Sequence, residues 1–293
     1  MVDEKNTLKL GIPSGSLQAS TLELFERAGF NVRVSSRSYA PSVDDPEIEA
    51  VMFRAQEMSR YVEDGVVDVG LTGVDWVMEN GSDVVEVAEL VYSKATSRPA
   101  RWVLAVPAES KVVKAEDLDG GIVATELVNC TRKYFEQKNV KVKVEFSWGA
   151  TEVKARLVDA IVDITETGSS LAANNLRIVD TILTSTTRLI ANKQAMQDAW
   201  KKAKIETLTL LLHGALEGRE KVGLKMNVPR SSLEAVVALL PAEKSPTVSA
   251  LADDNFVAVE VVLEERAERE LIPQLKKAGA SGIISYPLNK IIP

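Results

Sequence analysis

The stretch VDAIVDITETGSSLAANNLR, residues 158–177, decides the fold that we expect for the rest of the chain. Its apolar segment, residues 160–162, lies between Asp159 and Asp163 and predicts a buried strand. A turn follows at residues 165–170, and the residues after it begin a helix. A strand, a small hydroxyl-rich turn and a helix N-terminus in succession are typical of a parallel α/β sheet.

The turn at residues 165–170 has the composition of an anion site. Free N–H groups and the dipole at a helix N-terminus favour phosphate. Gly168 allows close approach of the backbone, and Thr167, Ser169 and Ser170 offer hydroxyl donors. On the turn alone, a serine that only caps the helix is an equal alternative. The two preceding aspartates favour a ligand with phosphate, ribose hydroxyls and Mg²⁺, because hydroxyls need acceptors and Mg²⁺ prefers oxygen ligands.

This stretch resembles the phosphoribosyl-diphosphate loop of the ATP phosphoribosyltransferase family, whose members open histidine biosynthesis. The family pattern runs from GxxE through an acidic ADAI-V/C-D strand to TG-S/A-S/T-L and ANxLR. The matching residues are Gly149, Glu152, Asp159, Asp163, Thr167, Gly168, Ser169, Ser170, Leu171, Ala173, Asn174, Leu176 and Arg177. Ala155 and Val158 depart from the family's frequent Pro and Ala, and we interpret both as packing variation.

Length and composition limit the class of protein. A chain of 293 residues can hold two or three domains, and 45% hydrophobic with 26% charged residues is ordinary for a soluble globular protein. The net charge of −7 argues against a nucleic-acid partner. The single cysteine, Cys130, excludes an intrachain disulfide and a Cys/His zinc cluster. Without a signal peptide or a membrane-spanning run, we expect a cytoplasmic protein with no membrane partner.

Strands that alternate with helices predict α/β architecture for the first part of the chain. Strands are expected at residues 8–12, 30–34 and 66–71, and helices at 17–28, 48–62 and from about Asp75. The chain is expected to cross to a second lobe near residues 89–98, to begin that lobe at 101–106 and to return at 179–191. A helix is expected at 193–216.

An internal echo indicates two similar lobes. At one constant offset the matched pairs are Gly11 and Gly121, Ile12 and Ile122, Leu17 and Leu127, Thr21 and Thr131, Phe25 and Phe135, Glu26 and Glu136, and Val32 and Val142. Asp68 also precedes its Thr-Gly pair by the same spacing as Asp163. Chance is the alternative, since short matches are common. The catalytic unit of the resembled family is two-lobed and periplasmic-binding-protein-like, so both Thr-Gly turns are expected to face a shared cleft.

The predicted domains follow from these patterns. Residues 1–95, completed by about 185–218, form catalytic lobe 1, and residues 96–184 form lobe 2 with the phosphoribosyl-diphosphate loop. Residues 219–293 show the order βαββαβ and predict a ferredoxin-like domain. Its strands are expected at 221–228, 247–251, 256–263 and 282–286, and its helices at 229–240 and 264–278. This segment resembles the regulatory domain of the long form of the family.

The resemblance implies an activity and its ligands. Phosphoribosyl would pass from phosphoribosyl diphosphate to N1 of ATP with release of pyrophosphate, Mg²⁺ would be the cofactor, histidine would inhibit, AMP is a further candidate ligand, and the chain would form a hexamer. The candidate catalytic residues are Asp163, Asp159 and Glu166. The candidate substrate-binding residues are Thr165, Glu166, Thr167, Gly168, Ser169, Ser170, Gly15, Ser16, Gly73, Asp75, Arg101 and Glu126. The candidate histidine-binding residues are Asn227, Ser245 and Thr247.

Several of these candidates have a purely structural alternative. Arg101 suits a phosphate or an interlobe salt bridge. Asp75 would approach the adenine or only begin a helix, and Glu126 would reach the nucleotide or only favour a helix start. His213, in an apolar run, is expected to pack or cap rather than to act as a base. Two rival functions stay open: a solute-binding protein, which a secretion signal would support, and an amino-acid-sensing module, which only the last 75 or so residues suit.

Overall fold

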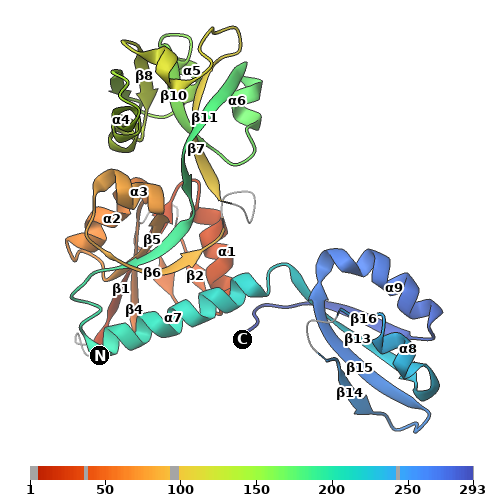
Figure 1. The fold of residues 1–293 in the computed structure, drawn as a ribbon. Coiled ribbons are helices and arrows are strands. Elements are labelled where there is room, and N and C mark those ends of the chain that lie inside the picture. The colour runs from red at the N-terminus through yellow and green to blue at the C-terminus, as the bar shows by residue number, and fades with distance from the viewer. Residues whose placement is uncertain (1–5, 36–38, 93–98, 242–244, 293) are drawn as a thin grey trace. The chain divides into compact units, whose positions relative to one another are not determined.

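The computed structural model describes residues 6–35, 39–92, 99–241 and 245–292. The chain divides into two compact units, residues 1–209 and 210–293. The division falls inside helix α7 (Ala199–Glu217), before the boundary predicted at residue 219. The first unit holds two lobes, and strands β7 (Ala100–Pro107) and β11 (Leu176–Ser185) run together through the second of them (Figure 1).

Lobe 1 is a five-stranded sheet flanked by helices. Its strand order is β4 (Ile48–Arg54), β1 (Leu8–Ser14), β5 (Val69–Gly73), β12 (Thr187–Ala191) and β6 (Val85–Leu90). The first three strands are parallel, and β12 is antiparallel to both of its neighbours. The helices are α1 (Gln18–Ala28), α2 (Ala55–Glu63) and α3 (Val74–Asn80), and β2 (Val32–Arg33) pairs with β3 (Ser42–Val43) outside the sheet.

The helix predicted at residues 48–62 is wrong in its first half. Ile48, Ala50 and Met52 are buried while the residues between them are not, which is the period-two burial of a strand. This segment is β4, whose whole length pairs in parallel with β1. The chain becomes helical only at Ala55, with Arg54 as the extended residue before the helix.

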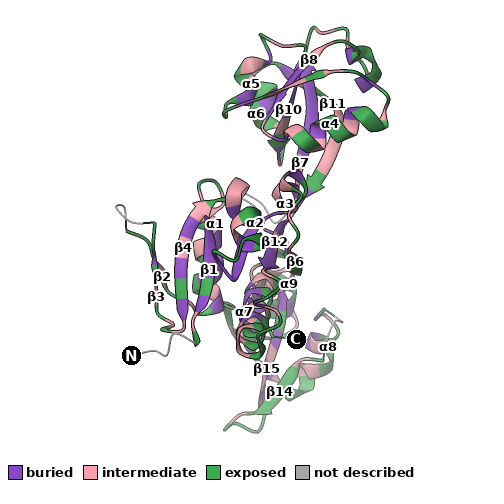
Figure 2. Ribbon diagram, turned by 90° about the vertical axis from the view of Figure 1, so that its left-hand side faces the viewer, coloured by how far each residue is buried: buried purple, intermediate pink, exposed green. Residues whose placement is uncertain are grey.

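Lobe 2 repeats the plan of lobe 1. Its strand order is β9 (Lys143–Phe146), β8 (Ile122–Thr125), β10 (Ala160–Thr165), β7 and β11. The first three strands are again parallel, and β7 is antiparallel to both neighbours. The helices are η2 (Ala115–Leu118), α4 (Val128–Gln137), α5 (Thr151–Lys154) and α6 (Ser169–Ala173). Figure 2 shows buried residues along the central strands of each sheet.

The equivalent first helices of the two lobes confirm the echo. Thr21 and Phe25 of α1 are buried, as are Thr131 and Phe135 of α4. Each helix is followed by a left-handed residue, Gly29 or Asn139. The predicted two-lobed unit is therefore confirmed.

The aspartate part of the echo is wrong. Asp68 precedes β5 and accepts a hydrogen bond from the backbone of Lys9 in β1 (2.9 Å). Its structural counterpart is Asp159, which precedes β10 and accepts from the backbone of Ile122 in β8 (2.8 Å). Asp163 lies further along β10 and has no such role. The two lobes differ in the length of the turns after their strands, so one offset cannot align both strands and helices.

The second unit is the predicted ferredoxin-like domain. Its elements are β13 (Lys221–Pro229), η3 (Arg230–Ser232), α8 (Leu233–Val237), β14 (Thr247–Ala250), β15 (Phe256–Glu264), η4 (Glu265–Ala267), α9 (Glu268–Lys277) and β16 (Ser281–Pro287). The antiparallel sheet has the order β14-β15-β13-β16, and its core packs beneath α8 and α9. The opposite face of the sheet carries exposed side chains. His213, on α7, is exposed, so the packing role expected for it is wrong.

None of the helices in the described part of the chain is long and apolar enough to cross a membrane.

Candidate functional site

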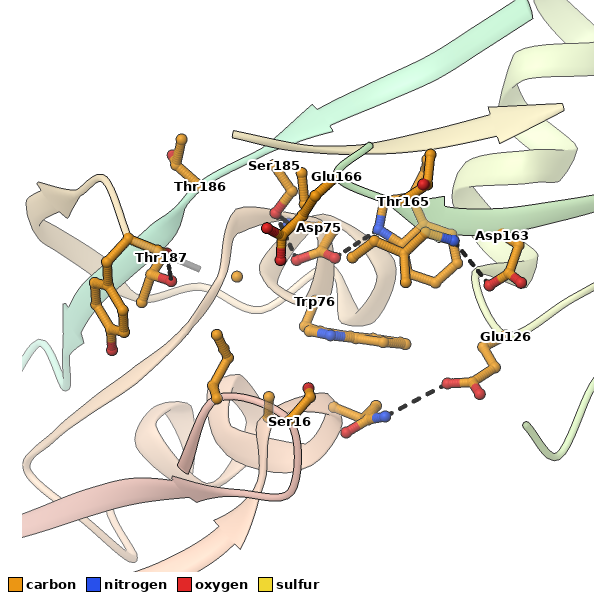
Figure 3. Close-up of a pocket in the computed structure, with 18 of the residues that line it drawn as sticks. Ser16, Asp75, Trp76, Glu126, Asp163, Thr165, Glu166, Ser185, Thr186 and Thr187 are labelled. Carbon is orange, nitrogen blue, oxygen red and sulfur yellow. Dashed lines mark hydrogen bonds between the residues drawn. The ribbon is translucent and has the colours of Figure 1, made fainter. Parts of the chain in front are cut away.

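A pocket of about 510 Å³ lies between the two lobes of the first unit (Figure 3). Residues at the carboxyl ends of β1, β4, β5, β8 and β10 line it, and ligands of open α/β sheets bind at such strand ends. Its polar lining consists of Ser14, Ser16, Arg54, Gln56, Asp75, Glu126, Asp163, Thr165, Glu166, Thr167, Ser169, Ser170, Ser185, Thr186 and Thr187. The pocket therefore brings the predicted loop of lobe 2 to the first strand-to-helix turn of lobe 1.

The loop after β10 is held in shape by its own hydroxyl groups. The backbone N–H of Gly168 donates to the Oγ1 of Thr165 (2.7 Å), and the hydroxyls of Thr167 and Ser169 lie 2.9 Å apart. Gly168 is left-handed, with φ 81°, which a residue with a Cβ adopts only at a cost. Ser170 donates to Glu152 of α5 (3.2 Å). The turn is a compact loop rather than a simple serine cap, since no side-chain cap bond is formed at this helix start.

Asp163 lies in a group of acidic side chains at the lobe 2 wall of the pocket. Burial raises the pKa of its carboxyl group to about 7, and the nearby carboxylates of Glu152 and Glu126 act in the same direction. The backbone N–H of Ile164 donates to Asp163 (2.8 Å) and opposes this shift. Asp163 is therefore poised to lose or gain a proton near neutral pH, and a bound cation would favour its charged form.

Glu126 connects the two lobes across the pocket. It follows β8 and accepts a hydrogen bond from the Nε2 of Gln56 in α2 (3.4 Å), which Figure 3 shows as a dashed line. The expectation that Glu126 only favours a helix start is thus incomplete, because its side chain lines the pocket and contacts lobe 1.

Asp75 is buried and fully engaged by neighbours. Its carboxylate accepts from the indole Nε1 of Trp102 (2.6 Å) and from the hydroxyl of Ser185 (2.8 Å). Burial raises its pKa, and these hydrogen bonds lower it. A Cβ on Gly73 would lie 2.0 Å from the Asp75 Oδ1, so the glycine makes room for this carboxylate. Asp75 thus connects the start of α3 to β7 and to the end of β11, which supports a positioning role.

Four predicted site residues do not line the pocket. Asp159 lies at the opposite end of β10 from the loop, with its carboxylate bound to the backbone of Ile122, so a catalytic role for it is not supported. Gly15 stands between the lining residues Ser14 and Ser16, and Gly168 holds the loop without facing the pocket. Arg101 lies outside the lining too, and among the described residues it forms no ion pair.

Arg54 is the functional residue that sequence reasoning missed. It ends β4 and is the one basic side chain among the described residues that line the pocket. Its guanidinium group lies next to Gly15, whose added Cβ would come within 2.9 Å of the Arg54 Nη1. The turn that carries Ser14 and Ser16 thus receives its positive charge from an arginine on a neighbouring strand. Arg54 could have been recognised as the last residue of a strand, but the prediction of a helix at residues 48–62 placed it inside a helix instead.

The half-buried thiol of Cys130, near the pocket, has a plainer role. Burial raises the pKa of the Cys130 thiol to about 12, and Glu79 nearby adds to the shift, so Cys130 is not a reactive thiolate. Within the described residues, no group of three or more His, Cys, Asp or Glu side chains is placed to hold a metal ion.

The candidate histidine-binding residues of the second unit lie at one exposed sheet face. Thr247 of β14 pairs with Glu260 of β15, and Glu260 lies next to Lys225, two residues before Asn227 in β13. Directly paired residues of a sheet share a face, so Thr247, Glu260 and Asn227 do so. Ser245, just before β14, is also exposed. Glu260 accepts hydrogen bonds from Tyr286 and Lys225, which lower the pKa of its carboxyl group. Sequence reasoning overlooked this carboxylate.

Comparison with known proteins gives concordant matches. The family model of HisG, described as ATP phosphoribosyltransferase, matches residues 54–214, and the model of the HisG C-terminal domain matches residues 218–290. A protein of Chlorobium phaeovibrioides named ATP phosphoribosyltransferase is 60% identical over 293 residues and covers all of both chains. Another of that name, from Pelotomaculum thermopropionicum, is 58% identical over 98% of this chain and 99% of its own.

A solved structure agrees with these matches. The ATP phosphoribosyl transferase (HisG:HisZ) complex from Thermotoga maritima contains a chain with 27% identity and a TM-score of 0.59. The match covers 70% of the present chain and 98% of that chain.

We expect the raised pKa of Asp163 to make the first unit less stable as the pH rises. The folded chain binds a proton on Asp163 that the unfolded chain, with a carboxyl pKa of about 3.9, has already lost, so the free energy of unfolding falls between pH ~4 and ~7. Asp163→Asn removes this loss and should be more stable than the wild type by about 4 kcal/mol at pH ~8, but not at pH ~4.

Urea unfolding followed by tryptophan fluorescence measures this effect, because all four tryptophans lie within the first unit. Stability curves of the two proteins that run parallel over the whole pH range would show that Asp163 titrates as it does in the unfolded chain.

Proposed function

The chain belongs to the ATP phosphoribosyltransferase family, and from that premise we propose the reaction that its pocket supports. Members of the family are pentosyltransferases that begin histidine biosynthesis. We propose that the phosphoribosyl group passes from phosphoribosyl diphosphate to N1 of the ATP adenine, with release of pyrophosphate. The observation that carries this proposal is the joint lining of one pocket by the loop at residues 165–170, the Asp163 carboxylate and Arg54.

The loop at residues 165–170 suits the 5′-phosphate. It combines a left-handed glycine with hydroxyls from Thr167, Ser169 and Ser170, and a helix begins directly after it. Backbone N–H groups and hydroxyls are the donors that a phosphate needs. Arg54, at the lobe 1 wall, suits the diphosphate, because a guanidinium group matches phosphate oxygens with two parallel donors.

Asp163 suits the ribose hydroxyls, since a carboxylate accepts hydrogen bonds that hydroxyls donate. Glu126, which accepts a hydrogen bond from Gln56 across the pocket, is proposed to contact the ATP. The adenine N1 already has a lone pair, so attack on C1′ needs no strong base. The barrier lies in the charge that develops at C1′ and on the leaving diphosphate, and positioning and electrostatics address both.

Magnesium fits this pocket as an ion that arrives with the substrates. The described lining contains one cation, Arg54, against the carboxylates of Asp75, Glu126, Asp163 and Glu166, which would repel bare polyphosphates. No ready-made set of three protein ligands exists within the described residues. Mg²⁺ commonly binds through one or two carboxylates plus substrate phosphates, and Asp163 with Glu126 would supply such carboxylates. The ion would neutralise charge on the leaving diphosphate.

The second unit is proposed to sense histidine and to inhibit the first. The match to the HisG C-terminal domain, residues 218–290, follows the HisG match in the same polypeptide, so a separate unit of this chain would be available to regulate the first. Thr247, Asn227 and Ser245 offer polar contacts on the exposed face. Glu260, on the same face, would supply the anion for the ligand's ammonium group.

Inhibition requires that histidine bind one global state better than another. We propose that this switch is a reorientation of domains or subunits within an oligomer, expected to be a hexamer. A domain that only mediates assembly is the alternative, and histidine titration separates the two.

Replacing Gly168 with valine should weaken the binding of phosphoribosyl diphosphate. A β-branched residue at φ 81° costs about 1–2 kcal/mol, and relief of that strain would distort the loop. We expect the KM for phosphoribosyl diphosphate to rise about tenfold or more, measured by pyrophosphate release. Gly120→Val is the matched control, because Gly120 has φ 82° and open space around it but lies away from the pocket. Equal KM values in the two variants would remove the loop from the site.

Thr247→Val and Glu260→Gln should each weaken histidine inhibition. Thr247→Val removes a hydroxyl and Glu260→Gln removes a negative charge at the proposed site, and we expect the dissociation constant for histidine, measured by calorimetry, to rise about tenfold in each. Thr207→Val, an exposed threonine of α7, is the control and should leave the constant unchanged. If millimolar histidine neither binds nor slows the intact enzyme, the second unit must be reassigned to assembly.

A further inference from the structure

Helix α3 carries two buried acids on one face. Asp75 and Glu79 are four residues apart, so they lie one turn apart on the same side of the helix. Both side chains are buried and both are bound by groups outside lobe 1 proper. We name Asp75 and Glu79 the α3 acid pair. Asp75 holds β7 and the end of β11, as described above, and Glu79 holds a different part of lobe 2.

Glu79 binds the first turn of α4 in lobe 2. Its Oε1 accepts from the backbone N–H of Asn129 (2.9 Å), and its Oε2 accepts from the backbone N–H of Cys130 (2.9 Å). The Asn129 Nδ2 in turn donates to the backbone carbonyl of Glu79 (3.0 Å). A carboxylate at a helix N-terminus satisfies unpaired N–H groups and interacts favourably with the helix dipole. Because Glu79 is 9% exposed, water screens this contact little.

The position of this contact connects it to the pocket. Helix α4 begins at Val128, two residues after Glu126, so the N–H groups that Glu79 binds belong to the segment that carries Glu126. The Glu126 side chain itself has one hydrogen-bond partner in lobe 1 among the described residues, Gln56, at the long distance of 3.4 Å. The hydrogen bonds between Glu79 and the start of α4 are shorter and more numerous than the Gln56–Glu126 contact, so they contribute more to the position of Glu126.

We propose that Glu79 is a positioning residue that fixes Glu126 for substrate binding. This inference rests on the proposed function. Glu79 lies outside the pocket lining, so we assign it no contact with the substrate. With the N–H groups of Asn129 and Cys130 bound, Glu126 is held in its binding position before the substrate arrives. The cost of ordering it is therefore not subtracted from the binding free energy.

The kinetic test compares Glu79→Ala, Glu79→Gln and Glu136→Ala. Glu136 lies on the exposed face of α4 and controls for loss of an acid. We expect Glu79→Ala to raise the KM for ATP about tenfold with kcat within about threefold, because binding is lost but the bound geometry is still reached. Glu79→Gln keeps one of the two acceptor oxygens and places an amide N–H against the other backbone N–H, so it should recover only part of the affinity. An unchanged KM for ATP, or a fall in kcat alone, overturns the proposal.

A double-mutant cycle tests whether Glu79 acts through Glu126. If it does, Glu79→Ala should lower kcat/KM about tenfold in the wild-type background and by less than about twofold in the Glu126→Ala background. Equal effects in both backgrounds would show that Glu79 acts independently of Glu126. If Glu79→Ala does not fold, Glu79→Asp, which is one methylene shorter and cannot span both N–H groups, takes its place in the cycle.

Hydrogen–deuterium exchange tests the contact without any assay of activity. The amides of Asn129 and Cys130 should exchange about tenfold or more faster in Glu79→Ala, and those of Lys133 and Tyr134 should not change. Unchanged protection at Asn129 and Cys130 overturns the proposal even if the enzyme is active. If protection is lost but the wild-type chain releases no pyrophosphate from phosphoribosyl diphosphate and ATP, the proposed function fails instead.

Discussion

The pocket depends on a buried carboxylate that three separate elements share. Asp75 begins α3, and it accepts from Trp102 of β7 and from Ser185 at the end of β11. These two strands belong to the sheet of lobe 2, whereas α3 belongs to lobe 1. A buried carboxylate without such donors would lose its hydration and gain no hydrogen bonds in exchange, which is unfavourable. These two hydrogen bonds therefore specify how α3, β7 and β11 are arranged. Gly73 is required here because a side chain would overlap the carboxylate.

Given that arrangement, the chemistry of the pocket is set by its charge. Acids outnumber bases in the described lining, and Asp163 sits where burial and neighbouring carboxylates keep its proton at a pH near neutral. Such a wall suits a substrate that brings its own cations. The binding of a magnesium diphosphate beside Asp163 would expel the proton, so binding would be coupled to proton release. In the proposed reaction, the loop at residues 165–170 and Arg54 would hold the phosphates from opposite lobes.

The loop could be predicted because its chemistry is local. A left-handed glycine, hydroxyl side chains and a helix start are all specified within a few consecutive residues, and the structure has them as expected. The βαββαβ domain was equally accessible, since each of its elements has a clear hydrophobic period.

Residues whose roles depend on distant partners could not be predicted. Nothing near Asp75 in sequence indicates that Trp102 and Ser185 bind it, and nothing near Asp159 indicates its bond to Ile122. Arg54 was missed for another reason, because β4 runs directly into α2 with no turn between them, so the sequence predicts one helix. An echo in sequence showed that two lobes exist, but turns of different length hid which aspartates correspond.

The most direct test of the central claim is identification of the product made by the purified chain. The protein would be incubated with Mg²⁺, phosphoribosyl diphosphate and ATP labelled with ¹⁵N at N1, and the adenine would be examined by NMR. The account predicts release of pyrophosphate that requires ATP, together with a new coupling between the labelled N1 and the ribose C1′. Pyrophosphate release without ATP, or a ribose attached to any other atom, would contradict it.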